Sequence, residues 1–193
     1  MVAGLAWSHM QASSSFRVAG ALHIRGFART SHGFTAIELM VTVAIVAILA
    51  ALAGPSFTPL IERWRVRDAA ETLTSTLYLA RSEAIKRAGG ITIDATGGWN
   101  TGWKITHTQN GVTTDIKVTA APNKTSIAQS NSKTLLYVDR WGMLSESNGG
   151  AANAMDFVLF PEGKTQTDNA ALRLCTTIGG RIAQVKHGAA CPA

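Results

Sequence analysis

Residues 34–53 read FTAIELMVTVAIVAILAALA, and this stretch decides the architecture of the chain. Its one charged residue is Glu38, and the other nineteen residues carry no charge. Twenty residues of α-helix rise about 30 Å, which is the thickness of the hydrocarbon core of a bilayer. The stretch therefore predicts a helix that crosses a membrane once.

Two other interpretations of this apolar run stay open. A secretory signal peptide has an apolar region of about 7–15 residues that ends at small residues, and residues 51–54 resemble such an end. A buried core helix would also be apolar, but residues 39–61 carry no charge at all, which is long for a small domain. The length of the run favours the transmembrane interpretation over both.

Glu38 is the unusual residue of the run. A carboxylate in a membrane span costs about 2.5–3.5 kcal/mol at the bilayer centre and less near the interface. No Lys or Arg lies within one helical turn of Glu38 in the sequence. The carboxylate therefore either sits at the level of the lipid headgroups or pairs with a positive charge that processing creates later.

The run GFTAIELMVT at residues 33–42 resembles the class III signal of type IV pilins and pseudopilins. In that family a prepilin peptidase cuts after the glycine and methylates the new N-terminal phenylalanine. The resemblance implies cleavage between Gly33 and Phe34, with N-methylation of Phe34. Glu38 would then be the fifth mature residue, the family's acidic position. Pro55 would be the twenty-second, where the family commonly has its helix-kinking proline.

The chemistry of this signal explains the buried acid. Cleavage would create a cationic α-amine on Phe34, and the Glu38 carboxylate would pair with that amine on a neighbouring subunit. A low dielectric strengthens such a pair, although desolvation offsets part of the gain. We therefore expect Glu38 to favour the docking of one subunit against the next.

The resemblance also implies that residues 1–33 are a leader that is removed. Family leaders are often short and basic before the glycine, whereas His32 here takes a position where Lys or Arg is common. Met10 is an alternative start to Met1. Three arginines precede the apolar run and three follow it closely, so loop charge does not set the orientation. The leader resemblance and the cysteines place the head in the periplasm.

A second helical pattern follows the prolines of residues 54–61 and stops at Gly89-Gly90. Small and apolar residues recur there at alternating spacings of four and three, which predicts one continuous helix face: Val66, Ala70, Leu73, Leu77, Ala80 and Ala84. A helix lying on a membrane surface is the weaker alternative because four acids offset its basic residues. We expect one kinked helix over residues 34–88 whose second half holds a sheet.

From residue 91 onward, turn residues separate short β-like runs. Asn110-Gly111 is a strong signal for a two-residue hairpin. The expected strands are 91–94, 99–106, 112–118, 135–139, 155–160, 171–175 and 181–185. This pattern predicts an α+β, pilin-like fold in which a long N-terminal helix packs on an antiparallel β-sheet head.

Three segments of this region resemble H-type pseudopilins and the FimT/FimU minor pilins. They are Trp99–Trp103, Val138–Gly142 and the ending that runs from Cys175 through Gly180-Arg181 to Cys191. The two tryptophans that flank Gly102 are expected to pack in the core rather than to form a binding platform. The implied organisation is a leader (1–33), a transmembrane helix (34–53), a kink with an amphipathic helix (54–90) and a β-rich periplasmic head (91–193).

Cys175 and Cys191 enclose fifteen residues. In an oxidising periplasm a disulfide between them would contribute about 3 kcal/mol by the loop-entropy model. Their spacing is not the C-x-x-C of redox enzymes. We therefore predict a structural disulfide rather than a reactive pair.

Composition and motifs argue against an enzyme. Hydrophobic residues make up 46% of the 193, which excludes a disordered chain, and two cysteines exclude a Cys-rich zinc module. The sequence holds no G-x-S-x-G, P-loop, H-E-x-x-H or G-x-G-x-x-G motif. Catalysis would require His107 or His187 as a base. The prediction is a non-enzymatic protein without a cofactor or a metal site.

The resemblance implies a minor pseudopilin of the H type, a structural subunit of a pilus-like fibre in a type II secretion or type IV pilus machine. A FimT-like minor pilin that binds DNA during uptake is the alternative. The implied partners are the prepilin peptidase, other pseudopilins or minor pilins, and the inner-membrane assembly platform. The expected location is the inner membrane, crossed once, with incorporation into the fibre.

DNA contact is the weaker of these predictions. The net charge of +6 falls to +3 after residue 33, but residues 169–193 hold three basic side chains and no acid. Arg181 and Lys186 are the candidate contacts for phosphates. The DNA-receptor members of the FimT group carry a second basic residue two positions after the Gly-Arg arginine, and Ala183 stands there in this chain.

Overall fold

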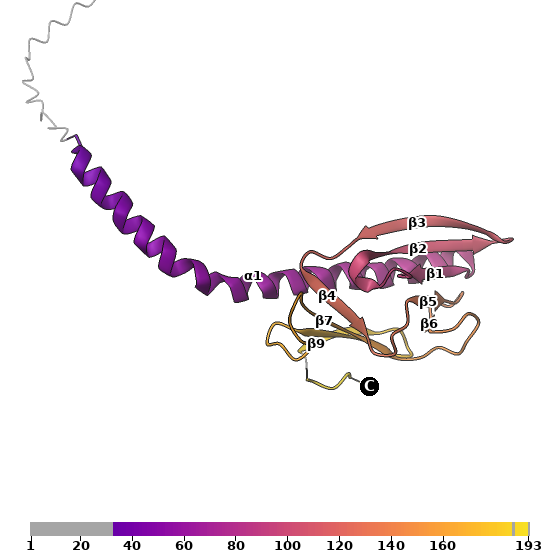
Figure 1. The fold of residues 1–193 in the computed structure, drawn as a ribbon. Helices are drawn as coiled ribbons and strands as arrows, with labels where there is room; N and C mark the ends of the chain where they lie inside the picture. Colours follow the sequence, from indigo (N-terminus) through magenta and orange to yellow (C-terminus); the bar gives the residue numbers. More distant parts are fainter. Residues whose placement is uncertain (1–32, 187, 193) are drawn as a thin grey trace, which may run out of the picture. The chain divides into compact units, whose positions relative to one another are not determined.

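The computed structural model describes residues 33–186 and 188–192, with the backbone alone for residues 53–56. Helix α1 (Ala36–Arg87) comes first and nine strands follow among the described residues. Figure 1 shows the second half of α1 lying along the β-strands of the head. The leader up to His32 and the tail residue His187 lie outside the described residues.

Local hydrogen bonds explain where α1 begins and ends. The Thr35 carbonyl accepts from the Leu39 N–H at 3.2 Å, which makes Thr35 the residue that caps the helix. At the other end the Gly89 N–H donates to the Ala84 carbonyl at 2.8 Å, and Gly89 takes a φ of 107°. The predicted helix over 34–88 is thus confirmed to within two residues at each end.

The strands form two antiparallel sheets, so the predicted α+β head is confirmed. The first sheet has the order β3-β2-β1-β5-β6, with β1 Ile91–Asp94, β2 Gly102–Gln109, β3 Val112–Ala120, β5 Leu135–Val138 and β6 Leu144–Ser145. The second has the order β4-β7-β8-β9, with β4 Thr125–Gln129, β7 Met155–Pro161, β8 Leu172–Thr176 and β9 Ile182–Lys186.

The structure corrects the predicted strands at three places. The run 99–106 begins as a short 3₁₀ helix, Trp99–Thr101, and the strand starts at Gly102. Strands β4 and β6 were not expected from the sequence. The hairpin at Asn110-Gly111 is confirmed, because Gln109 pairs with Val112 and both turn residues have positive φ.

The predicted helix face is the centre of the head. All six residues of the stripe are at most 1% exposed and belong to one hydrophobic cluster with the strands: Val66, Ala70, Leu73, Leu77, Ala80 and Ala84. Trp103 of β2 donates its indole N–H to the Thr76 hydroxyl at 3.0 Å, which satisfies both polar groups in the core.

The two tryptophans pack as expected. Trp99 and Trp103 are both buried, with ring centroids 5.9 Å apart. Trp99 also meets Phe157 of β7 edge to face at 5.0 Å, and its indole N–H donates to the Lys133 carbonyl. These rings therefore connect the first sheet to the second.

Candidate functional site

The predicted processing site precedes α1 as exposed chain without regular secondary structure. Gly33 has open space where a side chain would lie, and Phe34 is 80% exposed. The described segment on either side of the Gly33–Phe34 bond is thus accessible. Cleavage itself stays a prediction.

Glu38 lies in the first turn of α1, where its backbone takes part in the helix cap. Its backbone N–H donates to the Thr35 hydroxyl at 3.2 Å. Thr35 and Glu38 thus occupy the two ends of a Thr-x-x-Glu pattern, the signature of a capping box. A carboxylate here also favours the positive end of the helix dipole. The Thr-x-x-Glu spacing is visible in the sequence, although the charge of Glu38 alone does not point to it.

The first part of α1 presents its apolar side chains to the outside. Every described side chain from 34 to 52 and from 57 to 61 is exposed, including Ile37, Met40 and Leu49. Such a surface needs lipid or other protein to cover it. By length and hydropathy no single described helix meets the criterion for a membrane span. Two segments of α1, Ala36–Leu52 and Phe57–Arg87, meet it when they are taken together. The side chain of Pro55 lies outside the described residues, so its kink stays a prediction.

At the far end of α1, Arg81 connects two turns of the head. Its Nε donates to the Gly142 carbonyl at 2.8 Å, and its guanidinium also donates to the Gly180 carbonyl. Both glycines have φ near 77°, a conformation that other residues rarely adopt. Arg81 was not predicted from the sequence, because its two partners lie 61 and 99 residues away.

Cys175 and Cys191 are joined by a disulfide, with their Cα atoms 5.6 Å apart. Cys175 is buried on β8, while Cys191 is exposed. The closed loop contains β9, the edge strand of the second sheet. The bond thus ties the C-terminal segment to the strand that β9 pairs with. Its formation in the cell stays a prediction.

Arg181 and Lys186 do not form one cluster at a loop tip. Lys186 pairs with Leu172 in the sheet, whereas Arg181 precedes β9 and donates its N–H to the Thr177 hydroxyl. The two residues lie at opposite ends of a five-residue strand, about 17 Å apart along it at 3.4 Å per residue. Their contact with DNA stays a prediction, and the two cations would meet different parts of a ligand.

Lys186 instead shares a groove with the helix. The groove has a volume of about 490 Å³, and its lining includes Arg63, Trp64 and Arg67 of α1. From the sequence alone, these arginines stand out only as charges that follow the apolar run. The approach of α1 to β9 could not be inferred, since more than a hundred residues separate them.

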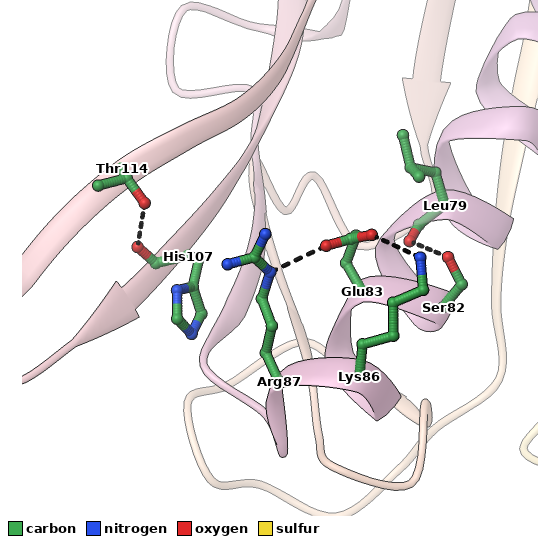
Figure 2. A network of polar contacts seen from close by, with 7 residues as sticks. All are labelled: Leu79, Ser82, Glu83, Lys86, Arg87, His107 and Thr114. Atoms are coloured by element: carbon green, nitrogen blue, oxygen red, sulfur yellow. Dashed lines mark hydrogen bonds and ion pairs between the residues drawn. The ribbon is translucent and has the colours of Figure 1, made fainter.

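His107, one of the two histidines considered as a base, is 8% exposed on β2. Its ring packs against Gly90, and its carbonyl accepts from the Thr114 hydroxyl at 3.4 Å. Figure 2 shows this histidine near the end of α1, where the Glu83 carboxylate accepts from Arg87 and Lys86. These hydrogen bonds, that of Arg87 first, lower the pKa of Glu83.

Within residues 33–186 and 188–192, no three His, Cys, Asp or Glu side chains gather as metal ligands. The features that the structure does assemble are an exposed processing segment, a capped acidic first turn, an uncovered apolar helix, a disulfide and a basic groove.

Two family descriptions match the chain. Residues 28–54 match the prokaryotic N-terminal methylation motif, and residues 69–188 match the type II transport protein GspH. The second match covers more than half of the chain.

Solved structures of low sequence identity are similar to this chain. The type IV minor pilin FimU of Pseudomonas aeruginosa is similar in two crystal forms, with TM-scores of 0.53 and 0.50 and 22% identity. The matches cover 66% and 64% of this chain and 92% and 94% of FimU. The minor pseudopilin EpsH from the type 2 secretion system of Vibrio cholerae gives a TM-score of 0.47 at 15% identity, over 65% of this chain and 99% of EpsH.

The methylation motif at the start of an apolar helix, the helix-on-sheet head and the match over that head lead to one assignment. The chain belongs to the GspH family, whose members are minor pseudopilins and minor pilins of type II secretion systems and type IV pili.

Proposed function

We propose that this chain is an H-type minor pseudopilin, a non-enzymatic structural subunit of a pilus-like fibre in a type II secretion machine. One observation carries the proposal: α1 changes from a wholly exposed apolar segment to a segment whose apolar stripe is wholly buried. An uncovered apolar helix attached to a stable head suits a subunit that moves from lipid into a bundle of like helices.

The proposed life cycle begins in the inner membrane, with the head in the periplasm. Prepilin peptidase cuts between Gly33 and Phe34 and methylates the Phe34 amine. The exposed Gly33–Phe34 segment and the methylation motif over 28–54 support this step. The helix then joins those of other pseudopilins on the inner-membrane assembly platform.

Mass spectrometry of the N-terminus tests the processing step. Membranes that contain active prepilin peptidase are expected to convert the chain to a form of 160 residues that begins at Phe34. Gly33→Leu is expected to leave the leader in place, because the bulky side chain obstructs the peptidase. A mature N-terminus near residues 53–54 would show an ordinary signal peptide and contradict the proposal.

The proposed assembly contact is the Glu38 carboxylate with the Phe34 amine of a neighbouring subunit. The capped first turn offers a competing explanation for this acid, and two substitutions separate them. Glu38→Gln keeps a side chain that suits the third position of a capping box but removes the charge. Glu38→Ala removes both.

We expect both Glu38 variants to be processed and to be missing from sheared or cross-linked fibres. Glu71→Gln is a matched control, since it removes an exposed acid from the same helix. Fibres with normal Glu38→Gln but without Glu38→Ala would assign the acid to the helix cap alone. Normal incorporation of both variants would remove the pairing argument.

The FimT-like alternative keeps a specific test. FimU, a type IV minor pilin, shares this fold, and Arg181 and Lys186 are both exposed. Deleting the gene is expected to abolish export of folded proteins and to leave surface pili intact, whereas loss of pili would favour the alternative. DNA retained by the full chain in neutral detergent at low salt, and lost in Arg181→Ala with Lys186→Ala, would support DNA binding.

A further inference from the structure

The groove between α1 and the second sheet gathers three cations. Arg63 and Arg67 lie one helical turn apart on α1, and Lys186, the last residue of β9, lines the same groove. All three side chains are exposed. In the described part of the chain none of them makes an ion pair within 4 Å. Their charges are therefore available to a ligand.

Asp68 and Glu71, the acids that follow Arg67 on α1, do not line the groove, and two other acids near it are paired elsewhere. Glu62 accepts from the Lys164 ammonium at 2.7 Å, and Asp168 lies 3.6 Å from the same ammonium. Asp168 also accepts from the Ala170 N–H at 2.8 Å. None of the described residues that line the groove is acidic. The charged side chains of the groove lining are thus all cationic, and the amide of Asn169 adds an uncharged polar group.

The groove also has an apolar wall that a simple anion would not need. Trp64 is 66% exposed, and Leu60 before it is half exposed. Both line the groove: Leu60 lies in the last turn of the uncharged run 39–61, and Trp64 follows that run by three residues. Trp beside Arg, next to an apolar helix, is the residue combination found where proteins meet the headgroup layer of a membrane.

We propose that this groove binds the phosphate headgroup of an anionic phospholipid. Arg63, Arg67 and Lys186 contact the phosphate, and Trp64 packs against the glycerol and the first acyl carbons. Bound lipid would hold the head near the membrane surface until the subunit is taken into a fibre. The inference rests on the proposed membrane anchoring, and its test below does not depend on processing or assembly.

Nucleic acid is the competing ligand for three cations. The groove favours lipid because its cations lie beside two exposed apolar side chains, Leu60 and Trp64. Both belong to α1, whose preceding part is the exposed apolar segment. Arg181, the other candidate DNA contact, does not line the groove. A DNA site built on Arg181 would therefore be separate from this one.

Native mass spectrometry of the full chain in neutral detergent tests the inference. The probes are phosphatidylglycerol, phosphatidylcholine, inorganic phosphate and a single-stranded oligonucleotide. The wild type is expected to retain phosphatidylglycerol about tenfold more tightly than phosphatidylcholine, since each cation near an anionic headgroup adds to binding. Arg63→Gln with Arg67→Gln and Lys186→Gln is expected to abolish that preference.

A matched triple variant separates the groove from net charge. Lys117→Gln with Lys124→Gln and Lys133→Gln removes three exposed cations outside the groove and is expected to bind as the wild type does. Trp64→Ala is expected to weaken phosphatidylglycerol binding several-fold and to leave phosphate binding unchanged, because it removes the apolar contact alone.

Four outcomes would overturn the inference. The first two are equal retention of phosphatidylglycerol and phosphatidylcholine by the wild type, and an equal loss of phosphatidylglycerol binding in the two triple variants. The third is binding of inorganic phosphate as tight as that of phosphatidylglycerol. The fourth is that the groove substitutions weaken binding of the oligonucleotide and leave lipid binding unchanged. The last would reassign the groove to nucleic acid. The N-terminus is determined in the same preparation. A chain that is correctly processed but does not prefer phosphatidylglycerol would overturn this inference and leave the proposed function standing.

Discussion

The two parts of α1 share one helical backbone and differ in what covers them. From 34 to 52 and from 57 to 61 every described side chain is exposed, although nearly all are apolar. From 66 to 84 a single stripe is at most 1% exposed, while the remaining faces carry charges such as Arg67 and Glu83. Both parts are thus helical, and the extent of apolar surface around the helix indicates what covers each part. Apolar residues on all sides suit lipid or other helices, and a single apolar stripe suits one sheet.

This difference separates two kinds of stability. The buried stripe holds the head together within one chain, because its side chains are removed from water by the strands. The exposed segment contributes nothing of this kind to the described residues and depends on lipid or on other subunits. Substitutions in the buried stripe should therefore change the stability of the head, whereas substitutions in the exposed segment should change its association with lipid or with other subunits.

The largest expected effect is on the buried stripe. Leu77→Ala is expected to lower the free energy of unfolding of the head by about 2–5 kcal/mol, because it leaves a cavity among packed side chains. Denaturant unfolding of the full chain in neutral detergent, followed by tryptophan fluorescence, measures this loss. Leu49→Ala, an exposed leucine of the same helix, is the control and should leave the curve unchanged. Equal losses would break the distinction between the two parts.

Next comes the disulfide, which fastens the head independently of the helix. Cys191→Ser is expected to cost about 3 kcal/mol of head stability, since the reduced chain gains conformational freedom when it unfolds. The same denaturant curve measures it. Reductant should shift the unfolding midpoint of the wild type to that of the variant, and it should leave the unfolding midpoint of the variant unchanged. A wild type that ignores reductant would show that the bond contributes no stability.

A smaller and local effect is expected at the helix start. Thr35→Ala removes the hydroxyl that accepts the Glu38 N–H and should cost about 1 kcal/mol of helix stability. Hydrogen exchange at the first-turn amides should accelerate, with no change in the unfolding of the head. Thr42→Ala is the control, because that hydroxyl donates to the Leu39 carbonyl within the helix and caps nothing. Equal acceleration in both would exclude a specific cap.

The smallest expected effect is a dependence on pH at the base of the head. The Glu62 carboxylate raises the pKa of Lys164 by accepting its hydrogen bond, and Asp168 adds to this. The pKa of Lys164 is therefore higher in the folded chain than in the unfolded chain. The ion pair stabilises the fold at pH values below the pKa of the unfolded chain, and this stabilisation is lost as the pH rises through the pKa of the folded chain. Unfolding midpoints of the wild type and Lys164→Gln should therefore converge above about pH 10.5. A constant difference across that range would assign the effect of Lys164 to packing.

Sequence periodicity predicted the long elements well. The stripe from Val66 to Ala84 and the Asn110-Gly111 hairpin depend on residues a few positions apart, so each can be inferred from a short window. Strand β4 was missed because its five residues include Thr, Ser and Gln, and pairing with β7 decides its conformation. Strand β6 has two residues, too few for an alternating pattern.

The candidate site divides in the same way. Gly33, Phe34 and Glu38 were identified from a contiguous motif, and the Thr35 cap was readable there as well. The contacts of Arg81 with the carbonyls of Gly142 and Gly180 were not, because nothing near Arg81 in the sequence points to either turn.

By itself the sequence determined the helical path, the uncovered apolar segment, the motif at its start and the presence of a helix face that must be buried. Those properties follow from neighbouring residues and from the hydrophobic effect, which act within a few helical turns. Tertiary structure alone decided that the strands divide into two sheets, that Arg181 and Lys186 separate, and that Lys186 meets Arg63 and Arg67. The approach of Lys186 to Arg63 and Arg67 joins segments more than a hundred residues apart, where chain order imposes no spacing. The two sheets are set by strand pairing that chain order leaves open, and Arg181 and Lys186 separate because β9 extends between them.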